Sequence, residues 1–403
     1  MSLHETSENG LYKLHLLLSG HTGAVACVAA HPDGTFIATG GEEGTRIWDL
    51  KTGHLVSSPT GAGDRGITTA VVFITKRDGA DDAIAFGTDN GYLCIWKRGS
   101  DEKEFEEIFS SRLTGGPDGQ EISAMAFDAS SSQLAVVHRA SVVHRFFIDA
   151  AMLPHSMKSC SIPYHWPQAV AFGQTGVKGI EIWSFGREDG EIHVVDEGGA
   201  IMKTWPTASV IGHAVLSVRD DTIVLDDITQ GVALYKLTGR SRIKTFPVPI
   251  QKKHRSRNVA FHDGGSSVLS GSDHGIVYVF DRRTGDITDT INIGVKDWVQ
   301  SITSIVIDGA PSIVVGRTGE NLGRTKLQVW TKRPSKNPTE SPDSVRRAAT
   351  IVEKGWWVLC ILLAMLFILQ NVMDLPRRGW LKKVVSGSEM VGDDAGESDF
   401  DYL

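Results

Sequence analysis

Short apolar runs separated by turn-forming residues are the dominant pattern from residue 11 to residue 332. The clearest example is residues 11–53, where the runs Ala24–Ala30, Thr35–Thr39 and Thr45–Leu50 stand between glycine, proline and aspartate residues. Runs of about four to eight residues with such borders favour β-strands over helices. Residues 11–53 therefore predict three strands joined by tight turns, with a further strand ahead of them.

The same unit recurs along the chain. In each copy the third strand closes on an aromatic or apolar residue, and these closing residues follow one another at intervals of 40 to 52 residues. They are Trp48, Trp96, Ile148, Val195, Tyr235, Phe280 and Trp330. A period of about 40–45 residues with several strands in each unit is typical of propeller blades. Seven closing residues therefore predict seven blades.

A pair of glycines spaced four residues apart precedes the third strand in four of the units. The pairs are Gly40/Gly44, Gly87/Gly91, Gly186/Gly190 and Gly271/Gly275. Because glycine adopts positive φ without strain, this spacing predicts a tight hairpin turn. Two more turns repeat: residues 49–53 return as residues 281–285, and residues 31–34 correspond to residues 262–265. These markers agree on one phase of the repeat.

The first unit resembles a WD40 repeat, because Gly20-His21 precedes its strands and Trp48-Asp49 closes them. The resemblance implies an all-β, seven-bladed WD40-type β-propeller over residues 11–332. It also implies that the strand 11–18 pairs beside residues 326–332 and closes the ring, which removes the open sheet edges. The buried hydrogen-bond set of the family maps onto His21, Thr39, Glu43 and Trp48, with Glu43 where the family has aspartate.

Composition narrows the classes of function only a little. A net charge of −7 over 403 residues is mild, so no nucleic-acid partner is expected. The four cysteines lack paired spacing, which predicts neither a disulfide framework nor a zinc site. Residues 1–10 are polar and predict a disordered N-terminus rather than a signal peptide, which places the propeller in the cytosol. No catalytic motif is found, so no cofactor and no small-molecule substrate are expected.

The composition changes after the last repeat. Residues 333–354 are rich in proline, serine and charge and predict a linker. Residues 355–373 carry no charge and would span roughly 28 Å as a helix, enough for a thin hydrocarbon core such as that of the endoplasmic reticulum. Because residues 356–369 are apolar all round, we expect a transmembrane helix with Trp356 and Trp357 at one interface rather than an amphipathic helix packed on the propeller. Residues 374–403 form a short tail, basic and then acidic, on the far side.

One basic run is the strongest candidate for a binding surface. It comprises Lys252, Lys253, His254, Arg255 and Arg257, in the loop before the first strand of the sixth unit. The family topology would place this loop on the same rim as the loop that contains Gly20-His21. A cationic loop there could contact an acidic peptide or an anionic lipid headgroup. The alternative is an ordinary solvated run of charge.

Other titratable residues do not indicate a catalytic centre. Four histidines stand near one another in the sequence without partners at zinc-ligand spacing, and are expected to be strand or surface residues: His138, His144, His155 and His165. Three acidic pairs are expected to cap loops: Asp81-Asp82, Asp220-Asp221 and Asp226-Asp227.

The sequence thus predicts a non-enzymatic interaction scaffold, tethered to an endomembrane through residues 355–373 with its propeller in the cytosol. The layout also resembles a membrane-anchored guanine-nucleotide exchange factor for a secretory-pathway small GTPase, although the glycine-rich N-terminal loop of that family is not found here. A third possibility, a propeller hydrolase, would need inward carboxylates or histidines from several blades in register. The closing strands show none.

Overall fold

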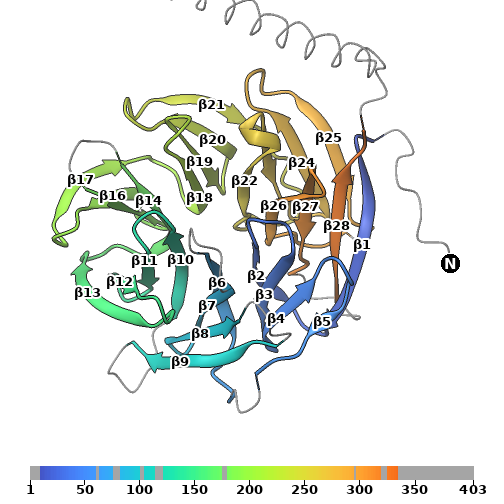
Figure 1. The fold of residues 1–403 in the computed structure, drawn as a ribbon. Helices are drawn as coiled ribbons and strands as arrows, with labels where there is room; N and C mark the ends of the chain where they lie inside the picture. The colour runs from blue at the N-terminus through green and yellow to red at the C-terminus, as the bar shows by residue number, and fades with distance from the viewer. Residues whose placement is uncertain are drawn as a thin grey trace, which may run out of the picture. The chain divides into compact units, whose positions relative to one another are not determined.

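The computed structural model describes residues 10–59, 63–75, 82–99, 104–113, 121–174, 179–294, 296–318 and 325–334. Their strands form seven antiparallel sheets of four strands each. The sheets stand around a common centre as the blades of a propeller (Figure 1). The predicted all-β fold with seven blades is therefore confirmed.

Each of the first six blades is built from four consecutive strands, the first at the channel and the fourth at the outer edge. Blade one is β2 (Val25–Ala30), β3 (Phe36–Gly41), β4 (Gly44–Asp49) and β5 (Leu55–Val56), and blade two is β6 (Thr68–Thr75), β7 (Asp82–Thr88), β8 (Tyr92–Arg98) and β9 (Glu106–Arg112). Blade three is β10 (Ile122–Asp128), β11 (Gln133–His138), β12 (Val142–Ile148) and β13 (Pro154–Ser161), and blade four is β14 (Pro167–Gly173), β15 (Glu181–Gly186), β16 (Glu191–Val195) and β17 (Ile201–Pro206). Blade five is β18 (Ile211–Ser217), β19 (Thr222–Asp227), β20 (Gly231–Lys236) and β21 (Arg242–Phe246). Blade six is β22 (Val259–His262), the short 3₁₀ turn η1 (Asp263–Gly265), β23 (Ser267–Ser270), β24 (Ile276–Asp281) and β25 (Ile287–Asn292).

The seventh blade joins the two ends of the propeller sequence. Its inner strands are β26 (Ile302–Ile307), β27 (Ala310–Val315) and β28 (Thr325–Lys332), and its outer strand is β1 (Tyr12–His21). β1 runs antiparallel beside β28, with Tyr12 opposite Lys332 and Leu18 opposite Leu327 (Figure 1). The predicted closure of the ring is confirmed.

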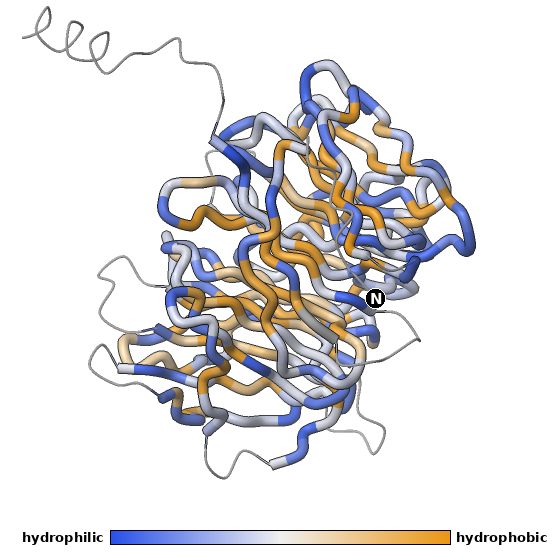
Figure 2. Tube along the Cα trace, turned by 90° about the vertical axis from the view of Figure 1, so that its right-hand side faces the viewer, coloured by the Kyte–Doolittle hydropathy of each residue, from blue (hydrophilic) through white to orange (hydrophobic). Residues whose placement is uncertain are grey.

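The hydrophobic core is divided into seven clusters, one at each contact between neighbouring blades. Between blades one and two, for example, Phe36 and Ile47 pack against Ile84 and Trp96. The second strand of a blade is covered on both faces, so that every residue of β3, β11 and β19 is buried. Figure 2 shows the same arrangement, with apolar positions along the strands and hydrophilic positions at the turns. Burial on both faces explains why these runs read as continuously apolar rather than alternating.

The two glycines of each repeated pair meet different requirements. The second glycine adopts positive φ, as expected for the turn: +82° at Gly44, +79° at Gly91, +64° at Gly190 and +86° at Gly275. The first is needed for space. A Cβ on Gly40 would lie 2.3 Å from Cγ2 of Thr68, on the first strand of the next blade.

Six of the seven predicted closing residues lie opposite an apolar residue of the second strand, as Trp48 does opposite Ile37. Blade three is the exception. There Phe146, not Ile148, lies opposite Leu134, so the predicted position was two residues too late. Both side chains are buried and point to the same face of the strand, because side chains alternate with a period of two. An apolar pattern alone could not separate them.

The described residues up to Arg333 form one compact unit. The predicted transmembrane segment 355–373, with Trp356 and Trp357, lies outside the described residues, as do nearly all of the linker 333–354 and all of the tail 374–403. In the part of the chain that the structure describes, no helix is both long and apolar enough to cross a membrane.

Candidate functional site

The structure brings the four residues of the WD40-type hydrogen-bond set together, with His21 at the end of β1 and the other three in the β3–β4 hairpin of blade one. Nε2 of His21 lies 2.7 Å from Oγ1 of Thr39, and Nδ1 of His21 lies 3.2 Å from Oε2 of Glu43. The other oxygen of Glu43 accepts hydrogen bonds from the backbone N–H of Thr22 and of Gly23. The ring of Trp48 packs 5.3 Å from that of His21. Glutamate at position 43 therefore links the loop ahead of β2 to the β3–β4 hairpin.

Blade four contains an equivalent set that was not predicted. Nε2 of His165 lies 2.8 Å from Oγ of Ser184, and its Nδ1 lies 2.6 Å from Oδ2 of Asp189. Asp189 directly precedes the second glycine of a pair, as Glu43 does in blade one. That placement was the available signal, but the histidine follows Tyr164 instead of glycine.

The same region holds the one group of three metal-capable side chains found among the described residues: His165, Asp189 and His193. The nitrogens of His165 are engaged by Ser184 and Asp189. Those of His193 lie 3.0 Å from Oγ1 of Thr204 and 3.2 Å from Oε2 of Glu191. Because these nitrogens already have partners, the group is best explained as a structural hydrogen-bond network.

The other histidines do not converge on a common point. His138 is fully buried, and its ring packs 4.8 Å from that of His144. His155 lies elsewhere, with Nε2 2.7 Å from Oδ2 of Asp149. These contacts are those of ordinary strand and surface histidines.

The acidic pairs differ from one another in environment. Asp221 bonds with Lys236 and Thr238 near the end of its hairpin, as expected of a loop cap, and Asp220 lies near Arg282. Asp82 pairs with His31 and Arg98, and Asp227 caps a turn at Thr229. Asp81 lies outside the described residues. The prediction for Asp226 was wrong, because this residue is fully buried within β19.

The backbone of the basic loop is held by a single carboxylate. Asp273, in the β23–β24 hairpin, accepts hydrogen bonds from the backbone N–H groups of Gln251, Lys252 and Lys253. Burial raises the pKa of Asp273, but its bonds to His274 and to these amides outweigh that effect and hold it at about 2. The side chains of Lys252, Lys253 and His254 are exposed. We call residues 251–255 the rim loop.

Arg257 does not belong to this exposed surface, so its prediction as a contact residue was wrong. It is 3% exposed, and its Nη2 lies 2.6 Å from Oδ1 of Asp226. Its backbone N–H also donates to Asp226, and its Nη2 donates to the backbone oxygen of Asp227. Burial raises the pKa of Asp226, and the charge and hydrogen bonds of Arg257 act against that rise. Arg257 therefore links blade five to the chain entering blade six.

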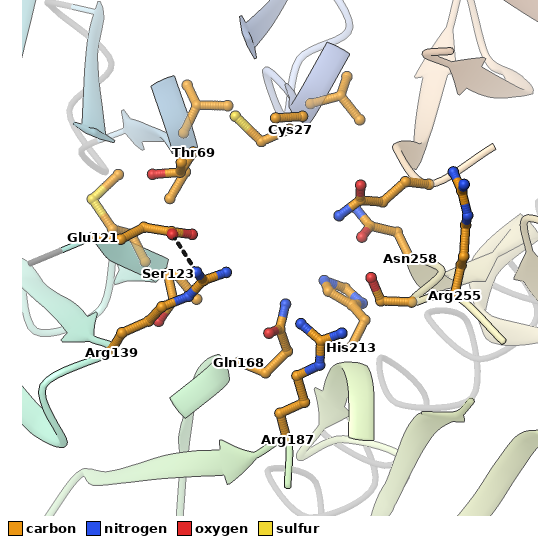
Figure 3. A pocket seen from close by; sticks show the side chains of 18 of the residues that line it. Cys27, Thr69, Glu121, Ser123, Arg139, Gln168, Arg187, His213, Arg255 and Asn258 are labelled. Atoms are coloured by element: carbon orange, nitrogen blue, oxygen red, sulfur yellow. Dashed lines mark ion pairs between the residues drawn. The ribbon is translucent and has the colours of Figure 1, made fainter. Parts of the chain in front are cut away.

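Next to the rim loop, the central channel opens into a cavity of about 440 Å³, lined by residues at the channel side of the blades. We call it the channel mouth (Figure 3). Arg139 and Glu121 face each other at its edge, with Nη1 2.7 Å from Oε2. Burial raises the pKa of Glu121. Arg255 lies at the other side, its guanidinium 4.8 Å from the ring centre of Trp298.

Two further side chains at the channel mouth are hydrogen-bond donors. Arg187 occupies the same hairpin position in blade four as Arg139 in blade three, directly after the last residue of the second strand. His213 accepts a hydrogen bond at Nδ1 from the backbone N–H of Val259, 3.2 Å away. Burial lowers the pKa of His213 to about 4, so the ring is neutral and its proton is on Nε2.

Comparison with known proteins supports the repeat assignment. Residues 12–49 match the sequence model of the WD40 family, described as "WD domain, G-beta repeat". This match spans β1 and the first three strands of blade one, and it therefore includes all four residues of the His21 set.

Three fungal proteins, each named ribosome biogenesis protein Erb1, are similar to parts of the chain. The protein of Pyrenophora tritici-repentis is 36% identical over 80 residues, which is 20% of this chain and 10% of that protein. The protein of Chaetomium thermophilum is 44% identical over 54 residues, or 13% and 7%. The protein of Botryotinia fuckeliana is 38% identical over 74 residues, or 18% and 10%. The aligned part is thus a tenth or less of each relative.

Seven four-stranded blades make the chain a seven-bladed β-propeller, and its residues 12–49 match the WD40 repeat.

Proposed function

We propose that this chain is a non-enzymatic interaction scaffold that binds partner proteins through the propeller face bearing the rim loop and the channel mouth. The observation that carries the proposal is the anchoring of the rim loop by Asp273. The side chains of Lys252 and Lys253 are exposed to solvent. Because Asp273 already holds the backbone of the loop, little conformational entropy of the loop is lost when a partner binds. A preorganised cationic loop suits an acidic protein surface.

The face is tested by proximity labelling with the full-length chain. We expect the double substitution Lys252→Glu and Lys253→Glu to reduce the labelling of partners strongly, because it reverses the charge of the rim loop. The matched control is Lys158→Glu with Lys203→Glu, which makes the same charge change on exposed positions of β13 and β17. Equal loss in both variants, or no loss in either, would contradict the proposal.

We also propose that residues 355–373 tether the scaffold to an endomembrane, with the propeller in the cytosol. The support is the uncharged segment itself, with Trp356 and Trp357 at one end. Confinement to a surface would raise the effective concentration of the propeller for partners on the same membrane.

Alkaline carbonate extraction tests the tether: the full-length chain should stay with membranes, and a version ending at Ala349 should not. Added protease should digest the propeller in intact vesicles, and recovery of the full-length chain in the soluble fraction would refute the tether.

The alternative function, nucleotide exchange on a secretory-pathway small GTPase, is supported only by the layout of propeller, apolar segment and short tail. It predicts that the full-length chain accelerates release of labelled GDP from the purified GTPase. The scaffold proposal predicts an unchanged release rate.

The names of the fungal relatives concern ribosome biogenesis, but similarity over so small a share of those proteins supports the repeat rather than a shared pathway.

A further inference from the structure

The channel mouth contains an arginine that forms no direct ion pair among the described residues. Arg187 is half-buried, and its charge acts at longer range on Glu121, which pairs directly with Arg139. The neighbouring cations differ. Arg139 pairs with Glu121, and Arg257 pairs with Asp226. A guanidinium in a partly enclosed site gains most from an anion that it can bind in a bidentate manner.

Two neutral groups beside Arg187 also need hydrogen-bond partners. The side-chain oxygen of Gln168 is buried and has no partner within the described part of the chain. The protonated Nε2 of His213 has no partner there either. Both side chains line the cavity and lie next to Arg187 in Figure 3. A carboxylate or a phosphate would accept from Nε2 of His213 while it binds the guanidinium, and a backbone N–H of the segment that carries it would donate to the side-chain oxygen of Gln168.

The surroundings favour a peptide over a free ion. On either side of the cavity an arginine lies over an indole ring, with Arg139 5.6 Å from the ring centre of Trp166 and Arg255 4.8 Å from that of Trp298. These flat surfaces could contact residues before and after an anionic one. Asn258 and Gln300 line the same cavity and offer neutral groups for peptide amides. A cavity of about 440 Å³ is within the usual range for a specific ligand site.

We propose that the channel mouth binds an acidic residue of a partner peptide, with Arg187 holding its carboxylate or phosphate, His213 donating a hydrogen bond to it and Gln168 accepting one from the peptide backbone. This proposal rests on the scaffold function and specifies its partner: the recognised segment carries a glutamate, an aspartate or a phosphoserine that enters the channel. The rim loop lies at the edge of the mouth and would contact the acidic surface around that segment.

The test is fluorescence anisotropy with the purified full-length chain in detergent. The probes are serine–glycine peptides that carry one central glutamate, one phosphoserine or one neutral glutamine. We expect at least one charged peptide to bind and the glutamine peptide to bind at least tenfold more weakly. Arg187→Gln should weaken binding of the charged peptide by about tenfold or more, because a charge-assisted pair is lost. Gln168→Leu is the second variant and should weaken binding by a smaller factor.

Arg283→Gln is the matched control. Arg283 is exposed in the turn after β24, at the opposite end of the blade from the hairpin that holds Asp273, and its loss should leave peptide binding unchanged. Equal binding by the wild type and Arg187→Gln, or no binding of either charged peptide, would overturn the proposal. Inorganic phosphate that binds at Arg187 while neither peptide binds would also overturn it, because the site would then be one for a free anion.

The Lys252→Glu and Lys253→Glu variant separates this proposal from the proposed function. Exposed charges at the rim have small effects on binding in the channel mouth. The dissociation constant of this variant for the charged peptide should therefore lie within about threefold of the wild-type value. If partner labelling is unaffected by the same substitutions, the rim-loop proposal fails while the channel-mouth site stands. If labelling falls but Arg187→Gln does not affect the peptide, the channel-mouth site fails.

Discussion

Glycine serves two separate purposes in the hairpin between the second and third strands, and substitution can separate them. Gly44→Ala should destabilise the chain by about 1–2 kcal/mol, because φ is +82° while the space around the missing Cβ is open. Gly44→Asn should recover much of this loss, since asparagine tolerates positive φ. Gly40→Ala should lower the free energy of unfolding by about 1–3 kcal/mol through overpacking against Thr68. Gly40→Asn should lower it further, because the asparagine side chain is larger. Urea unfolding of the four variants measures each effect, and equal rescue at both positions would refute the distinction.

Buried neutral histidines make the stability of the propeller sensitive to acid. Burial, with help from Arg46, lowers the pKa of His21 to about 4, and burial lowers that of His262 to about 4. Each folded-state pKa lies below the unfolded value of about 6.5, so the associated stability is complete above pH 6.5 and is lost as the pH falls towards 4. The loss is of the order of up to 3 kcal/mol for each residue.

The measurement is the free energy of unfolding at pH 7 and pH 5. We expect a clear fall in the wild type and a smaller fall in His21→Gln, which cannot titrate at this position. The raised pKa of Asp226 acts in the opposite direction over part of this range, but it is common to both proteins. An identical fall in both would show that His21 is not a source of the acid sensitivity.

Substitution by alanine should affect stability very differently at Arg257 and at Lys253 of the basic run. Arg257→Ala should destabilise the chain by about 3–5 kcal/mol, because it leaves Asp226 buried without its ion-pair partner. Lys253→Ala should change stability by less than about 0.5 kcal/mol, because the side chain is exposed. The measurement is the midpoint of thermal unfolding of both variants. Similar shifts of the midpoint would contradict the assignment of Arg257 to the core and Lys253 to the surface.

Sequence reasoning succeeded at residues whose requirement is local and failed where a partner comes from another blade. The turn glycines follow from φ alone and were found. The burial of Arg257 depends on Asp226, which stands on a strand of the preceding blade and gives no sign of the pairing along the chain. Arg187 was likewise missed, because only the closed ring places it beside His213.

At the scale of the element, the rim loop owes its order to the hairpin beside it rather than to its own sequence. Asp273→Asn would remove the charge that three backbone N–H groups share. We expect faster cleavage by trypsin after Lys252 and Lys253, mapped by mass spectrometry. Asp281→Asn is the control, because Asp281 also accepts backbone N–H groups, in the turn at the other end of the blade. Cleavage unchanged by Asp273→Asn would show that the loop is held by other contacts.

The closing position of the third strand was predictable wherever a glycine marked the hairpin before that strand. Blade three lacks that glycine, and Ser141 adopts the positive φ instead, at +65°. Without the marker, two apolar residues on one face of β12 were equally good closing positions, and the wrong one was chosen. In blade five the predicted closing residue, Tyr235, lies opposite Ile223 as expected.

At the scale of the whole molecule, the ring depends on a few contacts of its outermost strand. Oη of Tyr12 lies 2.8 Å from Nε2 of His262, whose other nitrogen lies 2.7 Å from Oγ of Ser304. Tyr12→Phe should cost about 1–3 kcal/mol, because it leaves a buried ring nitrogen without its partner. Tyr164→Phe, at a 99% exposed position, should have almost no effect on the unfolding midpoint. Equal midpoints for the two variants would mean that the contact with His262 does not stabilise the ring.

The pairing of β1 with β28 also bears on how the chain folds. The first strand of the propeller can find its place only after the last one exists, so it must stay unpaired while the six blades between them form. Contacts between such distant segments are slow to form because the entropy of closing a long loop is lost before they are made. Until then β28 presents an open edge that can pair with another chain. Newly made chains should thus pass through a vulnerable period, in which chaperone binding or pairing between two copies competes with completion of the fold.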